Sequence, residues 1–77
     1  MMHLTEREIK VVYLLASGNK NDQIGKELSI SAHTVKAHLE SIYNKFGVNN
    51  RVQAAIKAVQ TGIIDINSIE LNKFAKK

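Results

Sequence analysis

The clearest pattern of apolar and polar positions lies between Ser31 and Gly47. Four apolar side chains recur there at intervals of four, three and four residues: Val35, Leu39, Ile42 and Phe46. This spacing places them in one stripe along an α-helix. Ser31 can cap the helix by accepting a hydrogen bond from a backbone N–H of the first turn. Gly47 can adopt the left-handed conformation that ends a helix. The pattern predicts a helix over 31–46.

The opposite face of this helix is polar or small. It carries His33, Ala37, Glu40 and Asn44, flanked by Lys36 and Ser41. A surface that mixes donors, acceptors and small apolar groups suits contact with base edges in a DNA groove. Any amphipathic surface helix is also polar on its outer side. The stretch alone therefore leaves both interpretations open.

A first helix is predicted by a capping box over residues 5–8. Thr5 can cap the helix while Glu8 accepts a hydrogen bond from the backbone N–H of Thr5. We expect this helix to run to about Ser17 and to end at Gly18. Its polar strip is narrow, consisting of Glu6, Lys10 and Ser17. A helix with so much apolar surface is buried on most sides or contacts a partner.

A second, short helix is expected from Asp22 to Leu28, with Asn21 as its N-cap. Gly25 lies inside it, which costs about 1 kcal/mol relative to alanine in an exposed helix. Close approach of another helix at Gly25 would explain the residue. A tight turn at 29–30 then leads into the 31–46 helix. A short helix, a brief turn and a longer amphipathic helix form a helix-turn-helix.

A fourth helix is expected from Arg51 to Thr61, capped by Asn50 and ended by Gly62. It has two apolar faces. One is small, formed by Ala54, Ala55 and Ala58, and the other is branched, formed by Val52, Ile56 and Val59. We expect the small face to pack on the domain and the branched face to meet a second copy. The alternative is that both faces are core in so small a domain.

The C-terminal residues 65–77 form a basic extension. Ile63, Ile64 and Ile66 are expected to close the core. Asn67 could cap a short helix, although eight to ten residues are marginal unless the helix is packed. Leu71 and Phe74 are either docked or unconstrained, and the sequence does not decide between these alternatives.

The composition bounds the fold and the partners. The 77 residues suffice for one domain, and 44% are hydrophobic but only 5% aromatic, so the core is expected to be aliphatic. The net charge is +4, which favours an anionic partner, but Lys73, Lys76 and Lys77 supply most of the excess. Residues 1–72 hold eight basic and seven acidic side chains. Whether the chain binds an anionic partner therefore depends on where its individual charges lie.

Several classes of function are disfavoured by the residues present. The chain has no cysteine, which excludes disulfides and thiolate metal sites. His3, His33 and His38 share no metal-ligand spacing with nearby carboxylates, and a glycine-rich phosphate loop is lacking. We therefore expect neither an enzyme nor a cofactor. With no apolar run of roughly 20 residues and no secretory signal, we expect a soluble cytoplasmic protein without membrane contact.

The chain resembles the LuxR/NarL/FixJ-type (GerE-like) helix-turn-helix DNA-binding domain over Leu4 to about Ile64, roughly four fifths of its length. The markers keep the family's spacing without a gap: Leu4-Thr5-x-Arg7-Glu8, Gly18, Asn21, Ile24, Leu28, Ser31, Thr34-Val35-Lys36-x-His38, Ile42, Lys45-x-Gly47-Val48, Asn50-Arg51 and Gln53-Ala54. Two positions depart from the family. Gly25 stands where alanine is usual, and Glu40 stands where the residue is often basic or polar.

The resemblance implies a bacterial transcription regulator that dimerises through the fourth helix. The starts of the second and third helices would offer N–H groups to phosphate, together with Lys20, Asn21, Ser31 and Thr34. Lys36 can reach a guanine edge or a phosphate, Ala37 a thymine methyl, and Glu40 can accept from cytosine N4. Asn44 lies one turn further along. Arg51 is expected to contact phosphate or to brace the second turn, and the alternative for each residue is an ordinary solvated side chain.

The sequence therefore predicts an all-α, four-helix (tetrahelical) helix-turn-helix domain over 1–64, followed by the extension over 65–77. We expect sequence-specific binding to double-stranded DNA as a homodimer, with RNA polymerase as a further candidate partner. The chain is either a free-standing regulator or the output domain of a longer response regulator. The competing hypothesis is a helical protein–protein interaction module that keeps the fold without specific DNA binding.

Overall fold

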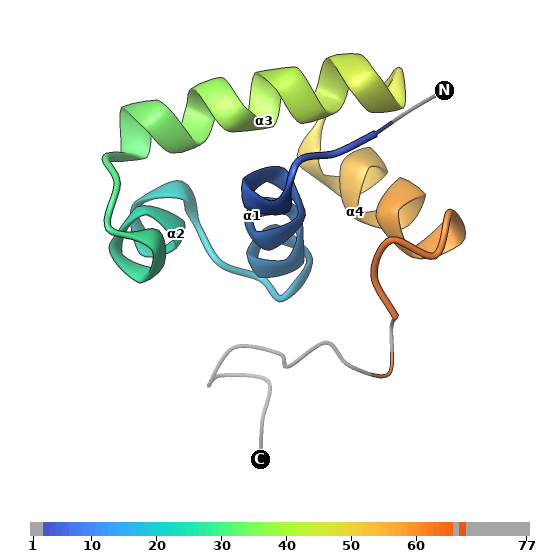
Figure 1. The fold of residues 1–77 in the computed structure, drawn as a ribbon, viewed down its shortest axis with the longest axis horizontal. Helices are drawn as coiled ribbons and strands as arrows, with labels where there is room; N and C mark the ends of the chain where they lie inside the picture. The colour runs from blue at the N-terminus through green and yellow to red at the C-terminus, as the bar shows by residue number, and fades with distance from the viewer. Residues whose placement is uncertain (1–2, 66, 68–77) are drawn as a thin grey trace.

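Four α-helices make up the fold in the computed structural model, which describes residues 3–65 and 67. They are α1 (Glu6–Ala16), α2 (Asn21–Leu28), α3 (Ala32–Phe46) and α4 (Arg51–Gln60). α3 lies along one side of the molecule, and α2, α1 and α4 lie in a row beneath it and all contact it (Figure 1). The predicted all-α class and the four helices are confirmed. The helix expected after Asn67 lies outside the described residues, as do Ile66, Leu71 and Phe74.

Three of the helices begin at the caps that the sequence predicts. The Glu8 N–H donates to Thr5 Oγ1 at 3.0 Å, and the Thr5 N–H donates to Glu8 Oε1 at 2.9 Å, which completes the capping box. The Thr34 N–H donates to Ser31 Oγ at 3.0 Å at the start of α3. The Gln53 N–H donates to Asn50 Oδ1 at 2.9 Å at the start of α4. Each cap satisfies a backbone donor that the first helical turn leaves without a partner.

The prediction of Asn21 as the cap of α2 is wrong. Asn21 is the first helical residue and Lys20 is the N-cap, with its backbone N–H donating to Gln23 Oε1 at 2.9 Å. The side-chain oxygen of Asn21 instead accepts a hydrogen bond from Arg51 Nη2 at 2.7 Å. A residue far along the chain therefore uses the group that local rules assign to capping.

The turn between α2 and α3 is closed by backbone contacts around Gly25. Ser29 adopts the left-handed conformation, with φ of 60°, and the Ile30 N–H donates to the Gly25 carbonyl at 2.9 Å. A Cβ placed on Gly25 would lie 2.5 Å from the Ile30 carbonyl oxygen and 3.4 Å from the Ala32 nitrogen. The expected close approach is confirmed, and what approaches is the backbone of the turn and the first residue of α3.

The core is aliphatic, with one phenylalanine, and all four helices contribute to it. The buried hydrophobic side chains among the described residues are Val11, Val12, Leu15, Ile24, Val35, Leu39, Ile42, Phe46, Ala54, Ala58 and Ile64. The four apolar positions predicted for α3 are all among them. Burying each of the larger aliphatic side chains contributes about 1.5–3 kcal/mol. Ile63 packs against this core and Ile64 enters it, as expected for the segment after α4.

In the part of the chain that the structure describes, every helix is too short or too polar to serve as a membrane span.

Candidate nucleic-acid interface

The solvent side of α3 carries five exposed residues: His33, Lys36, Ala37, Glu40 and Asn44. We call this surface the recognition face. It lies opposite the buried stripe, so the outer face predicted for the helix is confirmed at these positions. Because the stripe is fully packed, α3 has one orientation on the domain. The recognition face is therefore held in place by the core.

Ser41 does not flank the recognition face, contrary to expectation. It is half-buried, and its hydroxyl donates to Glu8 Oε2 of α1 at 2.7 Å. Lys45 Nζ lies 2.8 Å from Glu8 Oε1 and donates to it as an ion pair. Glu8 is only 5% exposed. The capping residue of α1 thus also holds α3 from its inner side.

The acidity of Glu8 follows from these contacts. Burial alone would raise the pKa of Glu8, but hydrogen bonds from Lys45, from the Thr5 backbone and from Ser41, with the positive charge of Lys45, outweigh it. The pKa is lowered from an ordinary 4.5 to about 2. Glu8 is therefore ionised at neutral pH, as a buried carboxylate with three donors should be. The capping role of Glu8 is predictable from neighbouring residues. Its hydrogen bond with Lys45 is not, because Lys45 lies 37 residues away along the chain.

A hollow of about 430 Å³ lies beside the recognition face. Lys36, Glu40 and Tyr43 line it from α3, and Asn21 and Arg51 line it from the first turns of α2 and α4. Four of the residues predicted to contact DNA therefore share one concave surface. Tyr43 was not predicted there, although it follows Lys36 by seven residues and so lies on the same side of the helix.

Arg51 braces the loop that precedes α2. Its Nη1 donates to the Asn19 carbonyl at 3.2 Å and its Nη2 donates to Asn21 Oδ1 at 2.7 Å. Hydrogen bonds from a charged guanidinium are stronger than neutral ones. Arg51 thus braces the loop before α2 rather than the second turn that the sequence suggested, and its contacts place the start of α2 relative to the start of α4.

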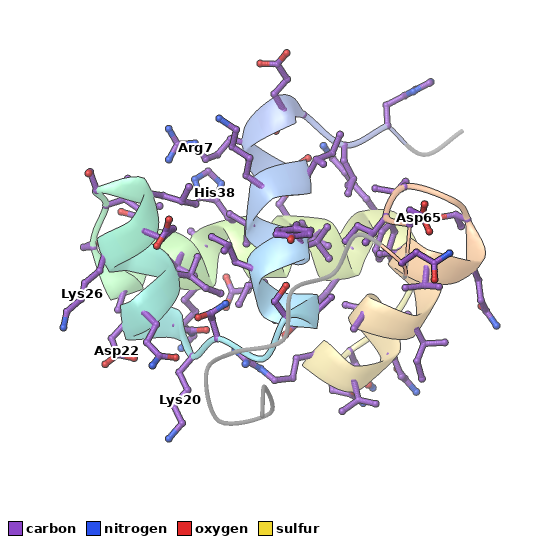
Figure 2. All side chains as sticks on the ribbon, turned by 90° about the horizontal axis from the view of Figure 1, so that it is seen from below. Arg7, Lys20, Asp22, Lys26, His38 and Asp65 are labelled. Carbon is purple, nitrogen blue, oxygen red and sulfur yellow. The ribbon has the colours of Figure 1, made fainter. Side chains whose placement is uncertain are left out.

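The remaining predicted contacts lie at the starts of α2 and α3. Lys20 is exposed and projects from the start of α2, away from the other helices (Figure 2). The Ser31 hydroxyl donates to Thr34 Oγ1 at 3.0 Å, besides accepting from the Thr34 N–H. This pair fixes the first turn of α3. Contacts of these residues with DNA stay a prediction.

The branched face of α4 is largely open to solvent. Val52 is 64% exposed and Ile56 is 52% exposed, whereas Ala54 and Ala58 on the other side are fully buried. Val59 is half-buried. The two-faced helix is therefore confirmed, and the alternative that both faces are core is wrong for Val52 and Ile56.

A family model described as "Bacterial regulatory proteins, luxR family" matches residues 2–58. The chain belongs to this family. The transcriptional regulatory protein YdfI of Bacillus subtilis (strain 168) is 45% identical over 65 residues, which cover 84% of this chain and 30% of YdfI. LiaR of the same organism is 40% identical over 62 residues, covering 80% of this chain and 29% of LiaR.

Solved structures agree with the sequence relatives. A chain of the response regulator ChrA of a heme-sensing two-component system superposes with a TM-score of 0.79 at 42% identity, covering 83% of this chain and 32% of that one. A chain of the Vibrio cholerae VqmA dimer gives 0.78 at 32% identity, covering 82% and 28%. The luxR-family chain described here thus carries a helix-turn-helix domain, as the residues predict, and spans about a third of the length of these relatives.

Proposed function

We propose that this luxR-family domain binds double-stranded DNA in a sequence-specific manner, with α3 in the major groove. The observation that carries the proposal is the recognition face itself. It presents a cation, an anion, an amide and a methyl group from one rigid helix, on the side opposite the buried stripe. The major groove of B-DNA, about 12 Å wide, admits an α-helix and displays donors, acceptors and the thymine methyl.

Three residues near the middle of this face would contact base edges. Lys36 donates to guanine O6 or N7, Ala37 packs on a thymine methyl, and Glu40 accepts from cytosine N4. Lys36 and Glu40 line the same hollow, one helical turn apart. Asn44 lies one turn beyond Glu40 and would reach the groove only where α3 enters it steeply.

Phosphate contacts would come from the starts of the helices. Backbone N–H groups and the dipole at a helix N-terminus favour an anion. Lys20 and Asn21 occupy this position on α2, and Ser31 and Thr34 occupy it on α3. Arg51 would act through Asn21 by holding the start of α2, with phosphate contact as a second role.

We further propose that two copies pair through the branched face of α4, using Val52, Ile56 and Val59. The exposure of Val52 and Ile56 supports this, because branched aliphatic side chains gain free energy when a partner covers them. A two-fold pair would place two α3 helices in successive major grooves. The protein would act as a cytoplasmic transcription regulator, with RNA polymerase as a candidate partner.

Binding of the wild-type domain to a random-sequence duplex, measured by fluorescence anisotropy at several salt concentrations, tests the DNA proposal. For a protein that neutralises Z phosphates, the logarithm of the association constant falls with the logarithm of salt concentration with a slope of about −0.9Z. A slope of several units is expected. Lack of binding at low salt would instead favour a protein–protein interaction module, for which the acidic Glu40 on the recognition face would be less unfavourable.

A further inference from the structure

Tyr43 is the aromatic residue in the hollow of about 430 Å³ beside the recognition face. We call this hollow the α3 hollow. Apart from Leu39, its lining consists of polar and charged residues: Asn21, Lys36, Glu40, Tyr43, Asn49 and Arg51. A lining rich in hydrogen-bond donors suits a charged group of the DNA, and the backbone phosphates are such groups.

The start of α2 indicates which part of the DNA would come near the α3 hollow. With α3 in the major groove, one sugar-phosphate strand runs along each side of the helix. In helix-turn-helix proteins, the helix before the recognition helix crosses the backbone. Asn21 belongs to the first turn of α2 and also lines the hollow. The strand whose phosphates approach the start of α2 would therefore pass over the α3 hollow.

The hydroxyl of Tyr43 is available to a ligand. The residue is half-buried and packs against the hydrophobic core. Among the residues that the structure describes, this hydroxyl forms no hydrogen bond, and every buried side-chain oxygen or nitrogen there has a partner. The hydroxyl therefore reaches solvent while the core holds the residue in place. A tyrosine with an apolar body and a solvated end is typical of binding surfaces.

The charges around the α3 hollow favour an anion by a small excess. Lys36 and Arg51 are cations, and Glu40 is the opposing carboxylate. Arg51 also uses its Nη1 and Nη2 groups to hold Asn19 and Asn21. A hydrogen bond from a neutral donor to an ionised phosphate is charge-assisted, and it is shorter and stronger than one between neutral groups. A directed donor such as the Tyr43 hydroxyl therefore complements the small excess of positive charge.

We propose that the Tyr43 hydroxyl donates a hydrogen bond to a backbone phosphate of the DNA, which lies in the α3 hollow. This contact rests on the proposed function, because the phosphate reaches the hollow only when α3 lies in the major groove. Contacts to phosphate carry no direct sequence information, but they fix the register of a protein on the duplex. Tyr43 thus helps to set where along the groove Lys36 and Glu40 meet the base edges.

The direct test is Tyr43→Phe, which removes the hydroxyl and keeps the ring. The affinities for a selected duplex and for a random duplex should fall by the same factor, roughly 10-fold, as for the loss of one hydrogen bond to a charged group. The salt slope should stay unchanged, because a phenol neutralises no phosphate charge. Tyr13→Phe removes the same hydroxyl from α1 and should leave both affinities unchanged.

The outcomes separate this contact from DNA binding itself. If the wild type binds both duplexes and a folded Tyr43→Phe protein binds them equally well, the contact is wrong although the proposed function stands. A loss confined to the selected duplex would assign the hydroxyl to a base and would also overturn the phosphate contact. If the wild type binds neither duplex, DNA binding and the contact are both wrong.

Fluorine NMR gives a second measurement that does not depend on the folding of a Tyr43 variant. The chain has two tyrosines, so incorporation of fluorotyrosine should give two signals, which Tyr13→Phe assigns. Addition of the random duplex at low salt should shift the Tyr43 signal and leave the Tyr13 signal in place. A Tyr43 signal that stays in place while the duplex binds would overturn the proposal.

Discussion

α3 and α4 follow the same rule of burial but present different chemistry to solvent. α3 buries four large side chains and exposes a polar face, whereas α4 buries the small Ala54 and Ala58 and exposes the branched Val52 and Ile56. The alanines let α4 pack closely on its neighbours, and the larger side chains of this helix lie on its solvent side. The fold needs only the buried stripe of each helix. The exposed stripes are therefore free to serve a partner, a polar one for α3 and an apolar one for α4.

Ile56→Glu should break the apolar side of this comparison with the largest effect. The fold should survive by circular dichroism, since Ile56 is half exposed. Binding to a duplex with two half-sites should fall by about 100-fold or more, because linked binding events multiply affinity by about 10²–10⁴.

Ile9→Glu is the matched control for Ile56→Glu, because it makes the same change at an exposed isoleucine of α1 and should leave two-site binding intact. Unfolding of the Ile56→Glu protein would contradict the exposed position of Ile56 and its assignment to a dimer face. If the variant folds and still binds both half-sites cooperatively, α4 is not the interface.

Glu8→Gln should weaken the contact of α1 with the inner side of α3 and lower the free energy of unfolding at pH 7 by at most about 3–4 kcal/mol. This figure is the upper limit set by the lowered pKa of Glu8, at about 1.4 kcal/mol per unit. Because the folded pKa lies below the unfolded one, the stabilisation is complete above pH 4.5 and is lost as pH falls toward 2.

Urea unfolding at several pH values measures this effect. The difference between wild type and Glu8→Gln should narrow as pH falls from about 4.5 toward 2. Glu27→Gln, at an exposed position of α2, should be as stable as the wild type at every pH. A gap independent of pH would mean that the carboxylate charge contributes nothing to the attachment of α3.

Lys36→Ala should weaken specific binding by about 1–3 kcal/mol if the lysine contacts a base edge. If it contacts phosphate alone, affinity should fall evenly across sequences and the salt slope should flatten by about one unit. Titrations with a selected duplex and a random duplex distinguish these results. Lys10→Ala removes the same charge from α1 and should change neither the specific affinity nor the salt slope. Unchanged affinity of a folded Lys36→Ala protein would remove Lys36 from the interface.

Glu40→Lys should produce the smallest effect. It replaces a charge that phosphate repels by one that phosphate attracts, so non-specific affinity at low salt should rise and the salt slope should steepen by about one unit. Preference at one base position should relax. Glu6→Lys, at an exposed position of α1, serves as the control for net charge. The absence of any gain from Glu40→Lys would mean that Glu40 points away from DNA.

The features that the sequence predicts correctly depend on neighbouring residues. The caps at Thr5, Ser31 and Asn50 act within three residues along the chain. The buried stripe of α3 follows from the period of the helix. Both kinds of signal are complete within one short stretch.

The features that the sequence does not predict depend on distant partners. Asn21 satisfies the local rule for a cap, yet Arg51, 30 residues away, takes its side-chain oxygen. Ser41 satisfies the periodicity of an outer position, yet Glu8, 33 residues away, draws its hydroxyl inward. The place of Tyr43 in the hollow likewise requires the packing of α2 and α4 against α3. Within the candidate interface, the helix face was therefore predictable and the bracing around it was not.

The proposal on which the others depend is that the recognition face of α3 contacts DNA. Its most direct test is a titration of the ¹⁵N-labelled domain with a short duplex, followed by amide chemical shifts. The largest changes are expected at Lys36, Ala37 and Glu40 and at the starts of α2 and α3, with little change at Ile9 and Lys10 on α1. Changes centred on α1, or none at low salt, would contradict it.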